Sequence, residues 1–61
     1  MNHIEFAAIC IFEHNNNAQT LEDFIESIAI ELLHYSEEES HLILDKLLPI
    51  MSEFIYTHFP I

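Results

Sequence analysis

The sequence predicts an all-α fold in a single small domain that spans residues 1–61. Two observations favour helices over strands. The chain contains no glycine, and the tight turns of β-hairpins need residues that adopt positive φ. Asn2, Thr20 and Ser36 each precede an acidic residue by three positions, which is the pattern of a helix-capping box. Three capping patterns predict three helices.

The first predicted helix runs from about His3 to His14 and is followed by the polar loop at residues 15–19. Its middle, FAAICIF, is apolar on every side, so periodicity alone does not separate a buried helix from a buried strand. The length of the segment and the lack of a second strand favour the helix. Cys10, the only cysteine, lies in this segment, where we expect it to be buried and inert.

The second predicted helix runs from Leu21 to about Tyr35 and has the clearest periodicity. Its apolar residues alternate at spacings of four and three, which is typical of a heptad seam. The seam consists of Leu21, Ile25, Ile28, Leu32 and Tyr35. Phe24 and Ala29 widen this stripe. We expect the seam to face the third helix in an antiparallel hairpin.

The third predicted helix begins at Glu37 and repeats the same rhythm, with a seam of Leu44, Leu47, Met51, Phe54 and His58. Its polar strip is narrow, so the helix must be covered on more than one side. Pro49 removes the hydrogen bond to the Asp45 carbonyl, and its ring crowds that turn. We therefore expect a kink or a break near Leu48, and a break would make Pro49 the start of a short fourth helix.

The composition predicts self-association. Hydrophobic residues make up 51% of the chain, and a domain of 61 residues buries a smaller share of its surface than a larger one. A lone cysteine rules out an internal disulfide and suits a reducing compartment. We expect the remaining apolar surface to be covered by a second copy, giving a homodimeric helical bundle.

The charge balance limits the partners. The chain has 11 acidic residues against one basic residue, Lys46, for a net charge of −10. This excess argues against direct binding of nucleic acid or of an anionic membrane, and it favours a basic protein surface. An alternative is that the acids only keep the protein soluble. The candidate partner-binding acids are Glu22, Asp23, Glu26, Glu38, Glu39, Asp45 and Glu53.

Two Glu-x-x-His patterns, Glu31 to His34 and Glu38 to His41, lie on either side of the predicted corner. In helix bundles, such patterns supply ligands to di-metal sites, where the ligands project into the interior. The seam instead places Glu31 and His41 beside the core and turns His34 and Glu38 outward. We therefore expect a capped corner that permits Glu–His hydrogen bonds between helices, with no bound metal or cofactor.

Catalysis has little support. Ser36 and Ser40 lie near His41, but Ser36 is assigned to capping and no third orienting group is apparent. The absence of glycine also excludes phosphate-binding loops and dinucleotide fingerprints. We expect that the protein is not an enzyme.

Three resemblances are architectural only. The hairpin from Thr20 to Phe59 resembles plasmid copy-control proteins that dimerise and bind RNA, but it lacks their basic face. Acyl carrier proteins are also small, acidic and helical, but their Asp-Ser-Leu motif is absent, and the nearest string is Glu26-Ser27-Ile28. In type, the chain is similar to the short acidic inhibitors of phages and mobile elements.

Two functional hypotheses follow. The first is an inhibitor whose acidic face occupies a basic, nucleic-acid-binding or nuclease surface by charge mimicry. The second is an adaptor, antitoxin or chaperone-like protein that docks a partner helix on Leu42, Pro49 and Tyr56, which are spaced at sevens along the third helix. The N-terminus has no basic region and no long apolar run, so we expect a cytoplasmic protein.

Overall fold

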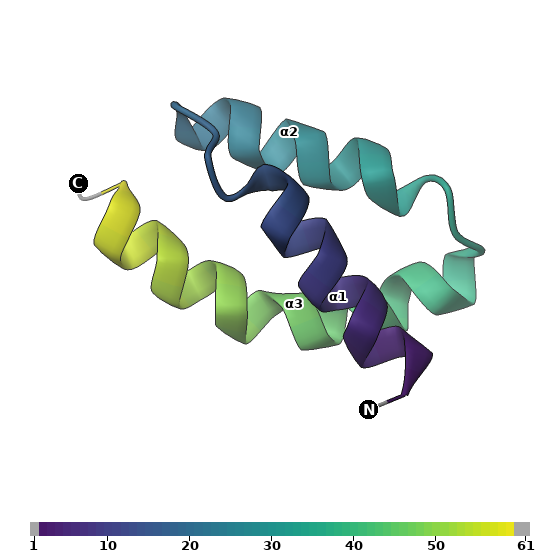
Figure 1. The fold of residues 1–61 in the computed structure, drawn as a ribbon. Coiled ribbons are helices and arrows are strands. Elements are labelled where there is room, and N and C mark those ends of the chain that lie inside the picture. The colour runs from purple at the N-terminus through teal and green to yellow at the C-terminus, as the bar shows by residue number, and fades with distance from the viewer. Residues whose placement is uncertain (1, 60–61) are drawn as a thin grey trace.

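The computed structural model describes residues 2–59 and confirms the all-α prediction, with three helices and no strand in that range (Figure 1). The helices are α1 (His3–Asn15), α2 (Leu21–Leu32) and α3 (Glu37–His58). The predicted starts of all three helices are correct. None of the helices described is both long and apolar enough to cross a membrane.

Local capping sets the start of each helix. In every case the side-chain oxygen of the capping residue accepts a hydrogen bond from a backbone amide three residues later, so a donor that the helix leaves unpaired is satisfied. The bonds are Glu5 N to Asn2 Oδ1 at 2.8 Å, Asp23 N to Thr20 Oγ1 at 3.1 Å and Glu39 N to Ser36 Oγ at 3.2 Å.

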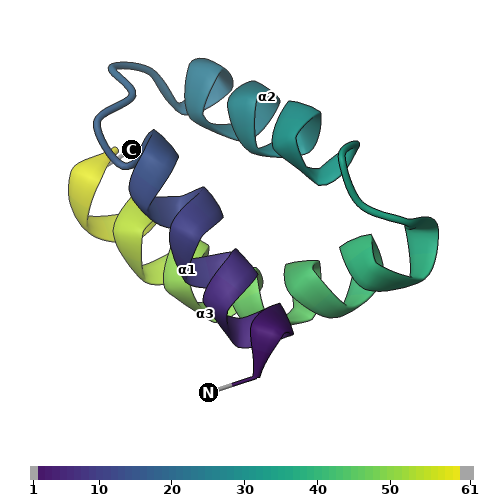
Figure 2. The same cartoon turned by 45° about the vertical axis from the view of Figure 1, so that its right-hand side comes forward.

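The first helix holds the other two together. α1 packs most extensively on α3 and also on α2, whereas α2 and α3 touch each other least. Figures 1 and 2 show α2 and α3 running in opposite directions on either side of the corner at residues 33–36, with α1 lying across one side of the pair. The fold is therefore a helical pair closed by α1, and the pair is not a tight hairpin on its own.

The core is apolar and draws on all three helices. Its buried residues are Ala7, Ala8, Ile11, Phe24, Ile28, Ile43, Leu47 and Met51. Aromatic rings extend it towards the end of α3. The Phe24 ring centroid lies 5.0 Å from that of Phe54, and the Phe12 centroid lies 5.2 Å from the same ring, so Phe54 joins α1, α2 and α3.

The buried stripe of α2 differs from the predicted seam. Phe24 is fully buried, whereas Ile25 and Tyr35 of the predicted seam are exposed. The prediction assumed that α2 faces only α3. Because α1 packs beside α2, the helix turns so that Phe24 and Ile28 point into the three-helix core. The α3 seam is closer to its prediction, with Leu47 and Met51 buried, although His58 is exposed.

The corner between α2 and α3 begins earlier than predicted. α2 ends at Leu32, and residues 33–35 form a tighter turn in which each amide bonds the carbonyl three residues back. Ser40 Oγ then donates a 2.7 Å hydrogen bond to the Leu32 carbonyl. Ser40 thus satisfies an acceptor at the end of α2 from within α3.

A break at Pro49 is not present, because α3 is one helix from Glu37 to His58 with Pro49 inside it. Asp45 and Pro49 are both exposed, so water can reach the turn that loses its hydrogen bond. A bend at Pro49 stays a prediction. Cys10 is half-buried, where we expected a buried thiol.

Replacing Phe24 with alanine should destabilise the fold more than any exposed substitution. A fully buried phenylalanine at the junction of three helices leaves a cavity, at a cost of about 3–5 kcal/mol. The matched control is Ile30→Ala, an exposed position on the same helix, where we expect a change of about 0.5 kcal/mol or less. Urea unfolding followed by circular dichroism measures both, and similar losses would contradict the assigned core.

Candidate interaction surfaces

Glu31 connects α2 to α1 by two hydrogen bonds. Its Oε1 lies 3.0 Å from His14 Nδ1, and its Oε2 accepts a hydrogen bond from the side-chain Nδ2 of Asn15. Asn15 also donates to the Ile11 carbonyl at 2.8 Å, which fixes its side chain at the end of α1. The Glu–His hydrogen bond of Glu31 therefore goes to α1, whereas the bond expected across the corner from α2 to α3 is absent among residues 2–59.

The other three residues of the two Glu-x-x-His patterns do not gather around Glu31. His34, Glu38 and His41 are exposed, and Glu38 and His41 line an open hollow of about 490 Å³ with Glu37 and Leu42. Within residues 2–59, no three histidine, cysteine or acidic side chains gather as metal ligands would. The two Glu-x-x-His patterns lie on either side of the corner between α2 and α3.

A second contact of the same kind ties α1 to α3. His3 Nε2 lies 3.4 Å from Glu39 Oε2, while the other Glu39 oxygen accepts from Ser36 Oγ at 3.3 Å. Both ends of α1 thus meet a carboxylate of another helix. No local sequence pattern indicates these pairs, because each depends on where α1 lies in the tertiary structure.

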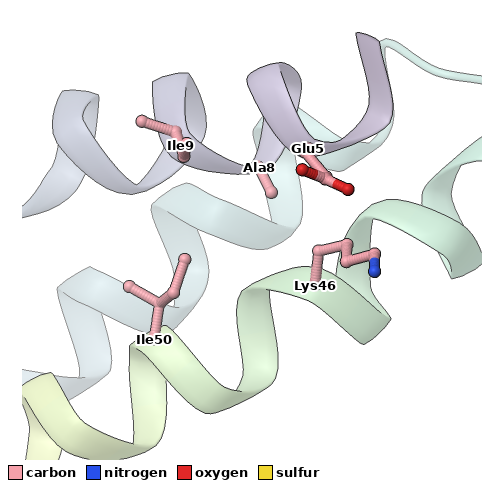
Figure 3. Close-up of a pocket in the computed structure, with 5 residues that line it drawn as sticks. All are labelled: Glu5, Ala8, Ile9, Lys46 and Ile50. Carbon is pink, nitrogen blue, oxygen red and sulfur yellow. The ribbon is translucent and has the colours of Figure 1, made fainter. Parts of the chain in front are cut away.

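Three hollows lie along the α1–α3 junction, and the middle one shares Ile50 with one neighbour and Lys46 with the other. Figure 3 shows the middle one, of about 330 Å³, in which Glu5 and Lys46 extend from facing helices at one end, and Ile9 and Ile50 lie towards the other. The hollows are lined by both apolar and charged side chains. The junction offers a shallow groove beside α3 in place of an enclosed pocket.

The outer face of α3, on the side away from the core, combines acidic and apolar side chains. Leu42 is 47% exposed and Tyr56 is 83% exposed, and Pro49 between them is exposed as well. Their spacing of seven places them on one side of the helix, and acids occupy neighbouring turns. We name this surface the outer α3 face, made of Glu38, Leu42, Asp45, Pro49, Glu53 and Tyr56.

The structure divides the seven candidate acids between the helices. Glu22, Asp23 and Glu26 are exposed on α2. Because Phe24 of α2 packs against Phe54 of α3, the exposed sides of the two helices point away from each other. Glu39 is half-buried and turned towards His3 of α1. The acids on α2 and those on the outer α3 face therefore form separate surfaces.

Comparisons of the chain with models of protein families, with curated proteins and with solved structures give no match. The functional argument therefore rests on the surfaces of the chain itself. Two features carry it: the outer α3 face, and the apolar residues that remain exposed on α2 and α3.

Replacing Glu31 with alanine should loosen the contact between α1 and α2. The substitution removes the acceptor for His14 and Asn15, and we expect a loss of about 1 kcal/mol in the free energy of unfolding. Glu26→Ala on the same helix removes an exposed carboxylate and should change stability by about 0.5 kcal/mol or less. Equal effects in urea unfolding would show that the Glu31 hydrogen bonds contribute nothing.

Proposed function

We propose that the protein is a small interaction module that binds a basic surface of another protein through the outer α3 face. The observation that carries this proposal is the exposure of apolar Leu42 and Tyr56 among the acids of one helix face. An apolar strip flanked by carboxylates is complementary to an apolar strip flanked by lysine and arginine.

The net charge of −10 adds long-range attraction to such a partner. Electrostatic steering raises the association rate with a cationic surface, and apolar contacts then slow dissociation. Basic surfaces of this kind are typical of nucleic-acid-binding proteins and nucleases. In the cytoplasm, the module would act as an inhibitor by occupying the surface that a phosphate backbone otherwise contacts, as inhibitors from phages and mobile elements do.

The length of the outer α3 face favours it over the acids of α2. From Glu38 to Tyr56 the face covers about five helical turns, whereas α2 has 12 residues in all. A longer face contacts more of a partner helix or ridge. The groove between α1 and α3 also runs beside it and supplies further apolar surface through Ile50.

A second function remains a candidate because Tyr56 is so exposed. In this version Leu42, Pro49 and Tyr56 dock an apolar helix of a partner, and the acids only maintain solubility. The protein would then be an adaptor, antitoxin or chaperone-like subunit. Charge would contribute little to its affinity, which separates it from the leading proposal.

Removing charge from the outer α3 face should weaken binding to a basic amphipathic helix. The probe is a fluorescein-labelled synthetic peptide with a leucine stripe flanked by lysine and arginine, and binding is followed by fluorescence anisotropy at low salt. For the triple variant Glu38→Gln/Asp45→Asn/Glu53→Gln we expect a loss of about tenfold or more in affinity, since several paired contacts disappear.

The matched control is Glu22→Gln/Asp23→Asn/Glu26→Gln, which removes the same charge from α2. It should weaken binding by about threefold or less, because only long-range attraction changes. Circular dichroism verifies that both triple variants keep their helices. Equal losses for the two variants, or no binding of the peptide by the unaltered protein, would overturn the assignment to the outer α3 face.

A salt titration of the same complex separates the two candidate functions. Binding that depends on charge should weaken by at least about tenfold between low and high salt, because screening shortens the range of the attraction. The variant Leu42→Ser/Tyr56→Ser should weaken binding at all salt concentrations if apolar docking dominates. Affinity that survives high salt but is lost in this variant would favour the adaptor over the inhibitor.

A further inference from the structure

The groove between α1 and α3 is continuous with the outer α3 face. Leu42 and Asp45 line the hollow at one end of the groove, and Glu53 lines the hollow at the other end. Half-buried apolar side chains from both helices line the same three hollows, namely Ile4, Ile9 and Phe12 from α1 with Ile50 and Phe54 from α3. A partner bound to the outer α3 face would therefore meet the groove as well.

The charged residues that line the groove are acidic, with one exception. Glu5 of α1 lines it, as do Asp45 and Glu53 of α3. Glu13, four residues after Ile9, is exposed and lies on the same side of α1. A second copy of the chain, with its net charge of −10, would be repelled from these carboxylates. Charge complementarity therefore selects a basic amphipathic helix, whose apolar side chains would enter the groove.

Lys46, the only basic residue of the chain, is the exception. It is exposed and lines two of the three hollows, and Figure 3 shows it opposite Glu5 of α1. Both ion pairs within residues 2–59 use a histidine as the cation, and neither involves Lys46. Its ammonium group is therefore accessible to a partner. A uniformly basic helix would bring a like charge against it, which disfavours such a helix.

We propose, on the basis of the function proposed above, that a helix of the basic partner lies along this groove and places one carboxylate against Lys46. From Leu42 to Phe54 the groove follows about three turns of α3, and Lys46 lies nearer the Leu42 end. A helix bound in the reverse direction would bring its carboxylate towards the other end, where Glu53 repels it. Lys46 thus selects both the charge pattern and the direction of the bound helix.

A set of synthetic peptides tests the role of Lys46. Each is the basic amphipathic peptide described above with glutamate in place of one lysine or arginine, so that all have the same net charge. In fluorescence anisotropy, one position should bind the unaltered protein about fivefold more tightly than the average of the others, because its glutamate meets Lys46. Lys46→Met should abolish this preference. The matched control is Ala29→Glu, an exposed position of α2 that changes the net charge by the same amount and should keep the preference.

Binding of none of the peptides, including the wholly basic one, would overturn the proposed function and this inference together. Binding of the wholly basic peptide without a preferred glutamate position would overturn the role of Lys46 alone. A preference that survives Lys46→Met would do the same.

The contribution of α1 separates the groove from the outer α3 face, which belongs to α3 only. Ile9→Ala removes apolar surface from the groove and should weaken binding of the preferred peptide by about fivefold. The matched control is Phe6→Ala, an exposed position of α1 that lines none of the three hollows, where we expect a change of about twofold or less. Circular dichroism verifies that both variants keep their helices. Unchanged affinity in folded Ile9→Ala would show that the partner helix does not enter the groove.

Discussion

The packing of α1 against both other helices is the contact on which the rest of the structure depends. Ala7 and Ala8 are buried there, and their small side chains let the backbone of α1 approach its neighbours closely. Since α2 and α3 touch each other least, the pair has little core without α1. The placement of α1 also decides which surfaces of α3 are available: a buried side, a groove beside α1 and the outer α3 face.

Local chemistry in the sequence predicts the helix starts well, because a capping bond joins residues only three apart. The buried stripe of α2 was less predictable. The predicted seam takes account of one neighbouring helix, whereas α2 packs against both α1 and α3 in the structure. Phe24 is therefore buried in place of Ile25. The partners of Glu31 escaped prediction for the same reason: His14 and Asn15 lie in α1, and no spacing in the sequence links them to α2.

The candidate surfaces were predictable where they depend on one helix and unpredictable where they depend on two. The spacing of Leu42, Pro49 and Tyr56 placed them on one side of α3, and all three are exposed there. Shared polarity in the sequence places the acids of α2 and α3 in one acidic face. In the folded chain the exposed sides of the two helices point apart, so these acids form two separate surfaces.

The proposed partner site combines two kinds of contact on one side of α3. Its carboxylates would attract a basic partner over a distance that salt shortens, whereas Leu42 and Tyr56 would contact the partner only once it is bound. Salt should therefore change mainly the rate of association, and loss of the apolar side chains should change mainly the rate of dissociation.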